Sequence, residues 1–137
     1  MLLDDLVNAC SEWGLQGIEQ LAGIPGTVGG AVVQNAGAYE HMISGKVDGE
    51  AELESVTCVD RQSRETMVLT KGECRFDYRT SRFKEEPDRY VIVHARLGLV
   101  PSRVSRGWVS TILPVSHLPR RPPPCQHLVR HPVAPNH

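Results

Sequence analysis

The densest glycine stretch of the chain reads Gly23-Ile24-Pro25-Gly26-Thr27-Val28-Gly29-Gly30-Ala31-Val32-Val33-Gln34-Asn35-Ala36-Gly37-Ala38-Tyr39. Pro25-Gly26 is a turn signal, and Thr27 is suited to cap a helix that runs from Val28 to about Asn35. The stretch therefore predicts a glycine-rich loop that leads directly into a helix.

Two readings of this loop follow from its residues. It lacks the Gly-x-Gly-x-x-Gly spacing of dinucleotide-binding loops, and no Lys-Ser/Thr pair follows it as in a P-loop. Glycines nevertheless let backbone N–H groups approach a ligand closely, and a helix that begins near Thr27 would direct its N–H groups at a bound phosphate. The alternative is a tight turn followed by close helix packing through Gly29, Gly30 and Ala31.

Upstream of the loop, the pattern predicts an amphipathic helix that ends at Gly14. Residues 15–21 allow one more short helical turn. The apolar positions that recur at helical spacing are Leu3, Leu6, Val7, Cys10 and Trp13.

Downstream of the loop, the period changes to that of strands. Residues 53–59 and 66–69 are rich in β-branched and apolar side chains and predict a hairpin. Thr70 and Glu73 fit a capping box, which predicts a short helix from Thr70. Residues 90–100 alternate as a third strand, so the fold class is α+β with an antiparallel sheet. The face expected to be apolar in this third strand consists of Val91, Val93, Ala95, Leu97 and Leu99.

Composition excludes several classes of function. The net charge of −1 gives no reason to expect nucleic acid or an anionic membrane as a partner. The acidic start does not resemble a signal peptide, and no apolar run approaches membrane-spanning length. The cysteines lack zinc spacing, which predicts reduced thiols in a cytoplasmic protein and no metal site. They are Cys10, Cys58, Cys74 and Cys125.

The last part of the chain has a different composition. All sixteen Asp and Glu residues lie at or before Asp88, and eight of the ten prolines fall from Pro101 onward. This bias predicts an irregular tail over residues 101–137, without a long helix or a central strand. It is compatible with a disordered segment, or with a GC-rich gene translated in the wrong frame, and we favour the second explanation.

The chain from about Leu6 to Val100 resembles the MurB family of flavin-dependent UDP-N-acetylenolpyruvoylglucosamine reductases. One signature is the stretch from Gly23 to Tyr39, and the second is the segment from Lys71 to Lys84, built around Tyr-Arg-x-Ser. The resemblance implies that residues 1–100 are the second half of a two-subdomain FAD-binding domain of the vanillyl-alcohol oxidase (PCMH) type. It also implies FAD contacts at Gly23, Ile24, Pro25, Gly26, Thr27, Val28, Gly29, Gly30, Asn35 and Gly37.

Arg79 is the residue to which the resemblance assigns catalysis. A guanidinium can bind a carboxylate through two parallel hydrogen bonds, and the family's substrate carries an enolpyruvyl carboxylate. Without the resemblance, a surface salt bridge would be the simpler role. We expect packing of the ring for Tyr78 and a structural hydrogen bond for Ser81, and Lys84 is a candidate for assisting an anionic substrate.

The resemblance implies an NADPH- and FAD-dependent oxidoreductase of peptidoglycan synthesis and cell-wall formation that acts on a small UDP-sugar. We expect this chain to be an inactive fragment of it, because the first flavin subdomain and the family's later serine and glutamate are missing. Two other hypotheses remain. One is a non-catalytic flavin- or nucleotide-binding module in which Arg79 anchors a phosphate. The other is a structural piece that binds nothing.

Overall fold

The computed structural model describes residues 1–38, 40–46, 53–101, 108–121 and 127–129. Its larger sheet has six strands, in the order β6-β5-β7-β8-β9 with β1 paired to β7, and every pair is antiparallel. These strands are β1 (Leu15–Gln16), β5 (Leu53–Asp60), β6 (Thr66–Thr70), β7 (Tyr90–Pro101), β8 (Trp108–Pro114) and β9 (His127–Val129). A smaller sheet follows the order β2-β3-β4, with β2 (Gly37–Ala38), β3 (His41–Met42) and β4 (Gly45–Lys46).

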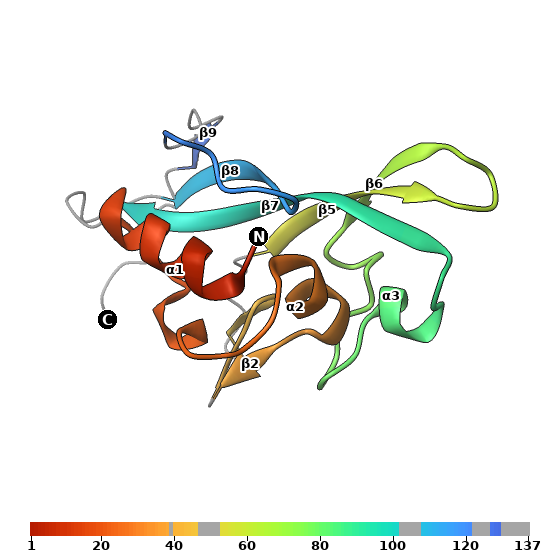
Figure 1. Cartoon of the computed structure of the whole chain (residues 1–137), viewed down its shortest axis with the longest axis horizontal. Coiled ribbons are helices and arrows are strands. Elements are labelled where there is room, and N and C mark those ends of the chain that lie inside the picture. Colours follow the sequence, from red (N-terminus) through yellow and green to blue (C-terminus); the bar gives the residue numbers. More distant parts are fainter. Residues whose placement is uncertain (39, 47–52, 102–107, 122–126, 130–137) are drawn as a thin grey trace, which may run out of the picture.

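The helices lie together on one side of the larger sheet (Figure 1). They are α1 (Leu3–Glu12), the 3-10 turn η1 (Glu19–Leu21), α2 (Val28–Gln34) and α3 (Arg82–Glu85). The apolar faces of α1 and α2 meet the sheet in one core, where the side chains of Leu6, Val32, Val56 and Leu97 are fully buried. Burying each such side chain contributes roughly 1.5–3 kcal/mol, so this core holds the helices against the sheet. The predicted α+β class is confirmed.

Two register shifts in the pairing of β5 with β7 change which side chains face the core. The pairing passes from Thr57↔His94 to Cys58↔Ile92, so Val93 is an extra residue in β7. One extra residue reverses the alternation of a strand. Val91 is therefore 50% exposed, whereas Ile92 packs against the core. The predicted single face is correct for Ala95, Leu97 and Leu99 and wrong for Val91.

The capping box at Thr70 forms without a helix. The backbone N–H of Thr70 donates to Glu73 at 2.8 Å, and the N–H of Glu73 donates back to the Thr70 hydroxyl at 3.3 Å. Only one turn follows, because Arg75 adopts the left-handed conformation (φ 50°), which ends helical winding. The nearest helix is α3, which begins at Arg82.

The expected irregular tail is wrong for part of its length. Strand β8 pairs with β7 over His94↔Pro114 to Leu99↔Val109 and lies between β7 and β9. Pro114 stands at the end of β8, and residues 108–113 contain no proline, so no ladder hydrogen bond is lost inside the strand. The expectation for residues 102–107, 122–126 and 130–137 lies outside the described residues. The division at residue 100 and the wrong-frame origin of the tail stay predictions.

Candidate functional site

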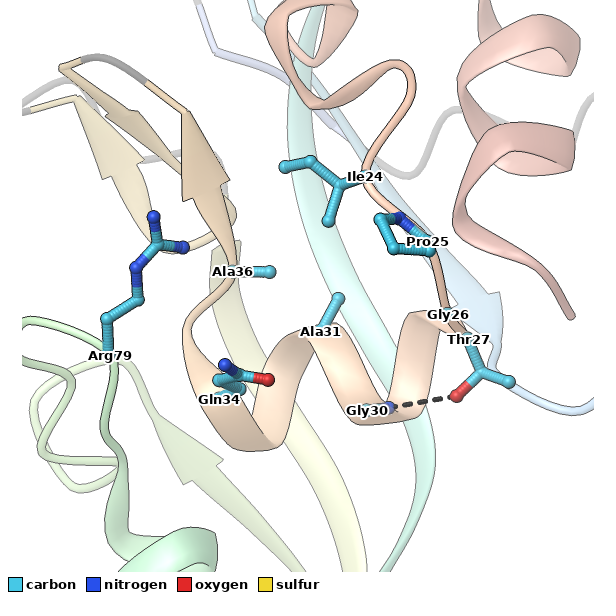
Figure 2. Close-up of a pocket in the computed structure, with 9 residues that line it drawn as sticks. All are labelled: Ile24, Pro25, Gly26, Thr27, Gly30, Ala31, Gln34, Ala36 and Arg79. Carbon is cyan, nitrogen blue, oxygen red and sulfur yellow. Dashed lines mark hydrogen bonds between the residues drawn. The ribbon is translucent and has the colours of Figure 1, made fainter.

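An open groove of about 340 Å³ lies beside the glycine-rich loop. Figure 2 shows Arg79 on one side of this groove and Ile24 and Pro25 on the other, with α2 and Ala36 between them. One wall is therefore apolar, and the opposite end carries a guanidinium and an amide. The nine residues that line the groove are Ile24, Pro25, Gly26, Thr27, Gly30, Ala31, Gln34, Ala36 and Arg79.

The loop is held in place by the start of the chain. The N–H of Gly23 donates to the Asp4 carboxylate at 2.7 Å, and the N–H of Leu3 donates to the Gly26 carbonyl at 3.0 Å. Gly23 (φ 81°) and Gly26 (φ 119°) both adopt backbone conformations that a side chain would strain. Local conformation therefore explains these two glycines without any ligand.

The start of α2 offers less to a phosphate than the sequence suggests. The Thr27 hydroxyl accepts from the N–H of Gly30 at 3.1 Å, which confirms the predicted cap. The N–H of Val28 donates to the Met1 carbonyl at 2.9 Å. Since the protein itself takes up these two N–H groups, and α2 is only seven residues long, a binding role for this groove depends on its side chains.

Arg79 belongs to a tight turn. Asp77 and Thr80 exchange backbone hydrogen bonds of 3.1 and 3.2 Å, which leaves Tyr78 and Arg79 as the two central residues. Arg79 is in the left-handed conformation (φ 53°), which an arginine adopts only where its surroundings hold it. The Lys84 ammonium donates to the Arg79 carbonyl at 2.9 Å and holds the turn from outside.

Arg79 differs in charge pairing from the arginines around it. Arg75, Arg82 and Arg89 all lie within 3.2 Å of a Glu86 carboxylate oxygen. The hydrogen bond from Arg89 is the main reason that the pKa of Glu86 lies below its usual range. Among the described residues, Arg79 makes no ion pair, in contrast to these three arginines.

Two buried side chains connect α2 to the segment that carries Arg79. The Asn35 amide donates to the Asp77 carbonyl at 2.9 Å, and the Ser81 hydroxyl donates to the Val33 carbonyl at 2.6 Å. Both side chains are fully buried, so these hydrogen bonds are shielded from water. The structural hydrogen bond predicted for Ser81 is confirmed. The two sequence signatures are thus one packed unit with the groove at its surface.

No family model matches the chain. Among curated proteins, it is 46% identical over 95 residues to the UDP-N-acetylenolpyruvoylglucosamine reductase of Streptomyces coelicolor, covering 69% of this chain and 23% of that protein. It is 44% identical over 96 residues to the reductase of the same name from Pseudomonas aeruginosa, covering 70% and 26%. The crystal structure of MurB from Thermus caldophilus superposes with a TM-score of 0.61 at 33% identity, over 74% of this chain and 34% of that one.

The chain is related to a segment of the MurB reductases. It spans about a quarter of the length of the curated relatives that it matches. Agreement in sequence and in structure shows that its fold is that of the corresponding part of a MurB reductase.

Half of the contacts that the MurB resemblance implied line the groove. Ile24, Pro25, Gly26, Thr27 and Gly30 do so. Gly23, Val28, Gly29, Asn35 and Gly37 are not among the lining residues. Val28 is core, and Gly37 lies where β2 meets β3, with no room for a side chain. Sequence reasoning did not include Ala31, Gln34 or Ala36 among the contacts. The two alanines are small residues that carry no chemical signal, and Gln34 was considered only as a residue that hydrogen-bonds flavin or backbone, or simply ends the helix.

Tyr78 does not pack its ring as expected. Its side chain is 78% exposed, and the nearby guanidinium of Arg79 lies 5.6 Å from the ring centroid. Among the described residues, no group of His, Cys, Asp and Glu could hold a metal ion, and no helix is long and apolar enough to cross a membrane.

Proposed function

We propose that the groove binds the enolpyruvyl carboxylate of a UDP-sugar, as part of a site that also holds a flavin in a MurB-type reductase. The observation that carries the proposal is the guanidinium of Arg79, which has no ion pair within the described residues and lines one groove with the glycine-rich loop. The relatives that share this segment are named as UDP-N-acetylenolpyruvoylglucosamine reductases.

Arg79 suits the chemistry of such a reduction. Its two parallel N–H groups bind a carboxylate and fix the double bond next to it. When hydride adds to one carbon of that bond, electron density moves towards the carboxylate. A fixed cation there stabilises charge that is larger in the transition state than in the ground state, which lowers the barrier.

The residues present fit part of a flavin site. Ligand pockets usually measure roughly 300–1,000 Å³, so a groove of about 340 Å³ holds a ring system rather than a whole dinucleotide. Ile24, Pro25, Ala31 and Ala36 offer an apolar wall to a flat ring, and Gln34 offers an amide to its polar edge. Flavin supplies the hydride when it is bound. NADPH, the family's reductant, has no assigned residue here.

The proposal is tested by titrating the chain with UDP-N-acetylglucosamine enolpyruvate and, in parallel, with UDP-N-acetylglucosamine, which lacks the carboxylate. Isothermal calorimetry should show at least tenfold tighter binding of the enolpyruvyl compound, because a charge-assisted bidentate contact contributes roughly 1.5–3 kcal/mol. Arg79→Met should abolish this difference, and Arg79→Lys should restore only part of it.

Arg64 provides the matched control. It is also an arginine in the left-handed conformation (φ 60°), but it belongs to the turn between β5 and β6 and does not line the groove. Arg64→Met should leave the preference unchanged. Equal affinity of the parent chain for the two sugars would refute the carboxylate assignment. Added FAD and NADPH would then test turnover, which we still expect to be absent in this chain.

A further inference from the structure

Asn35 uses its whole side-chain amide inside the protein. Its nitrogen donates to the Asp77 carbonyl at 2.9 Å and lies 3.4 Å from the Met42 sulfur, and its oxygen accepts from the N–H of Ser44 at 3.3 Å. The side chain is fully buried, and its backbone (φ 49°) ends α2 in the left-handed conformation. One residue thus joins α2, the smaller sheet and the turn that carries Arg79.

The hydrogen bond to Asp77 controls the turn directly. Asp77 immediately precedes the two central residues of the turn, and its own N–H and carbonyl both pair with Thr80. A shift of the Asp77 peptide therefore moves Arg79, which lies two residues further along the chain. Lys84 also contacts the turn, by donating to the Arg79 carbonyl, but its ammonium is exposed and water competes for this hydrogen bond. The hydrogen bond from the buried Asn35 amide is therefore the stronger constraint on the turn.

We infer that Asn35 is a positioning residue for Arg79, which rests on the proposed role of Arg79 in binding the substrate carboxylate. The amide holds the Asp77 peptide so that the guanidinium is directed into the groove before a ligand arrives. Preorganisation of this kind raises affinity because the bound ligand does not have to order the side chain. The resemblance implied that Asn35 contacts FAD. Because its side chain is buried, we assign it instead an indirect role, through the position of Arg79.

Two substitutions separate the amide from the backbone role. Asn35→Gly keeps the left-handed end of α2 and removes the side chain. Asn35→Asp also tolerates that conformation and keeps an acceptor for Ser44, but it has no N–H to donate to Asp77. Asp88→Gly is the control, because Asp88 is another left-handed residue (φ 64°) and lies away from the groove lining.

The first measurement is the backbone order parameter of Arg79 in the 137-residue chain, from ¹⁵N relaxation. We expect the rigid value of about 0.85 in the parent and in Asp88→Gly, and a fall below about 0.6 in both Asn35 variants. A uniform loss of stability would not change one turn of the folded state. An unchanged order parameter at Arg79 in Asn35→Gly would overturn the inference.

The second measurement is a double-mutant cycle with phosphoenolpyruvate, a small enolpyruvyl carboxylate, as the titrated probe. Asn35→Gly should weaken binding about tenfold in the parent and have no further effect in Arg79→Met, because Asn35 acts through Arg79. Independent, additive effects would overturn the inference. If the parent binds no phosphoenolpyruvate, this result counts against the proposed function of the groove. The order parameter of Arg79 still tests the positioning role of Asn35 independently.

Discussion

Replacing Gly37 with alanine distinguishes packing from cofactor binding as the reason for this glycine. A Cβ at Gly37 would lie 2.5 Å from the His41 carbonyl oxygen, 2.8 Å from Met42 Cγ and 2.9 Å from Met42 Cα. Two of these three atoms are backbone of β3, which pairs with β2 through Gly37↔Met42, so they cannot retreat without breaking that pair. Gly37→Ala should therefore reduce the free energy of unfolding by about 3 kcal/mol, the upper end of the usual cost of overpacking.

Urea denaturation followed by circular dichroism measures this loss directly, and the melting temperature should fall by on the order of 10 °C. Gly29→Ala is the matched control. It lies inside α2 with nothing within 4 Å of its Cβ, so alanine there should raise the free energy of unfolding by about 0.5–1 kcal/mol. If Gly37→Ala were as stable as the parent but bound flavin more weakly, the packing explanation would be refuted. The FAD contact that the resemblance implies for Gly37 would then be the better explanation.

Three further outcomes are expected. Thr27→Ala should lower the free energy of unfolding by about 1 kcal/mol through loss of the helix cap, and Thr27→Ser should restore most of it in the same urea titration. The pKa of Glu86 is lower in the folded protein than its usual value, so the ionised carboxylate stabilises the folded state. This contribution is complete above the usual carboxylate pKa of about 4 and is lost as the pH falls through the folded value. The urea midpoints at pH 7 and pH 3 should therefore differ less in Glu86→Gln than in the parent. Burial raises the pKa of Cys10 and Cys74 to about 12 and also raises the pKa of Cys58 above its usual value. In a Cys125→Ser variant, Ellman's reagent at pH 8 should therefore label none of these three thiols before denaturant is added. Rapid labelling in the native state would contradict their burial.

Local patterns were sufficient to predict the regular elements. The helix spacing near the start, the cap at Thr27 and the alternation of the hairpin strands each depend on residues close in sequence. All three are confirmed by α1, α2 and the β5–β6 pair. The two failures have different causes. The bulge at Val93 depends on a neighbouring strand that is distant in sequence. The helix expected from Thr70 stops for a local reason, because Arg75 takes the left-handed conformation.

Strand β8 shows a different limit. Residues 108–113 contain β-branched and apolar residues without proline, but prolines and arginines dominate the sequence around them. Averaging over the whole tail therefore hid a short segment that can pair. A strand needs only a compatible backbone and a neighbouring edge, and β7 supplies that edge from His94 to Leu99. A proline therefore argues against a strand at its own position, and a high proline content of the tail does not exclude a strand in a proline-free segment of it.

The sequence showed which chemical groups the candidate site contains, but not which of them face the groove. A permanent cation and a glycine-rich loop were both visible in the sequence, and their meeting in one groove is what a shared ligand requires. The sequence could not show which polar residue faces outward, because Asn35 and Gln34 are adjacent and carry the same amide group. Only the left-handed end of α2 turns Asn35 inward to Asp77 while Gln34 stays at the groove. A residue in a binding signature can therefore serve the ligand through its neighbour's backbone, and the measured rigidity of Arg79 would decide whether Asn35 does so.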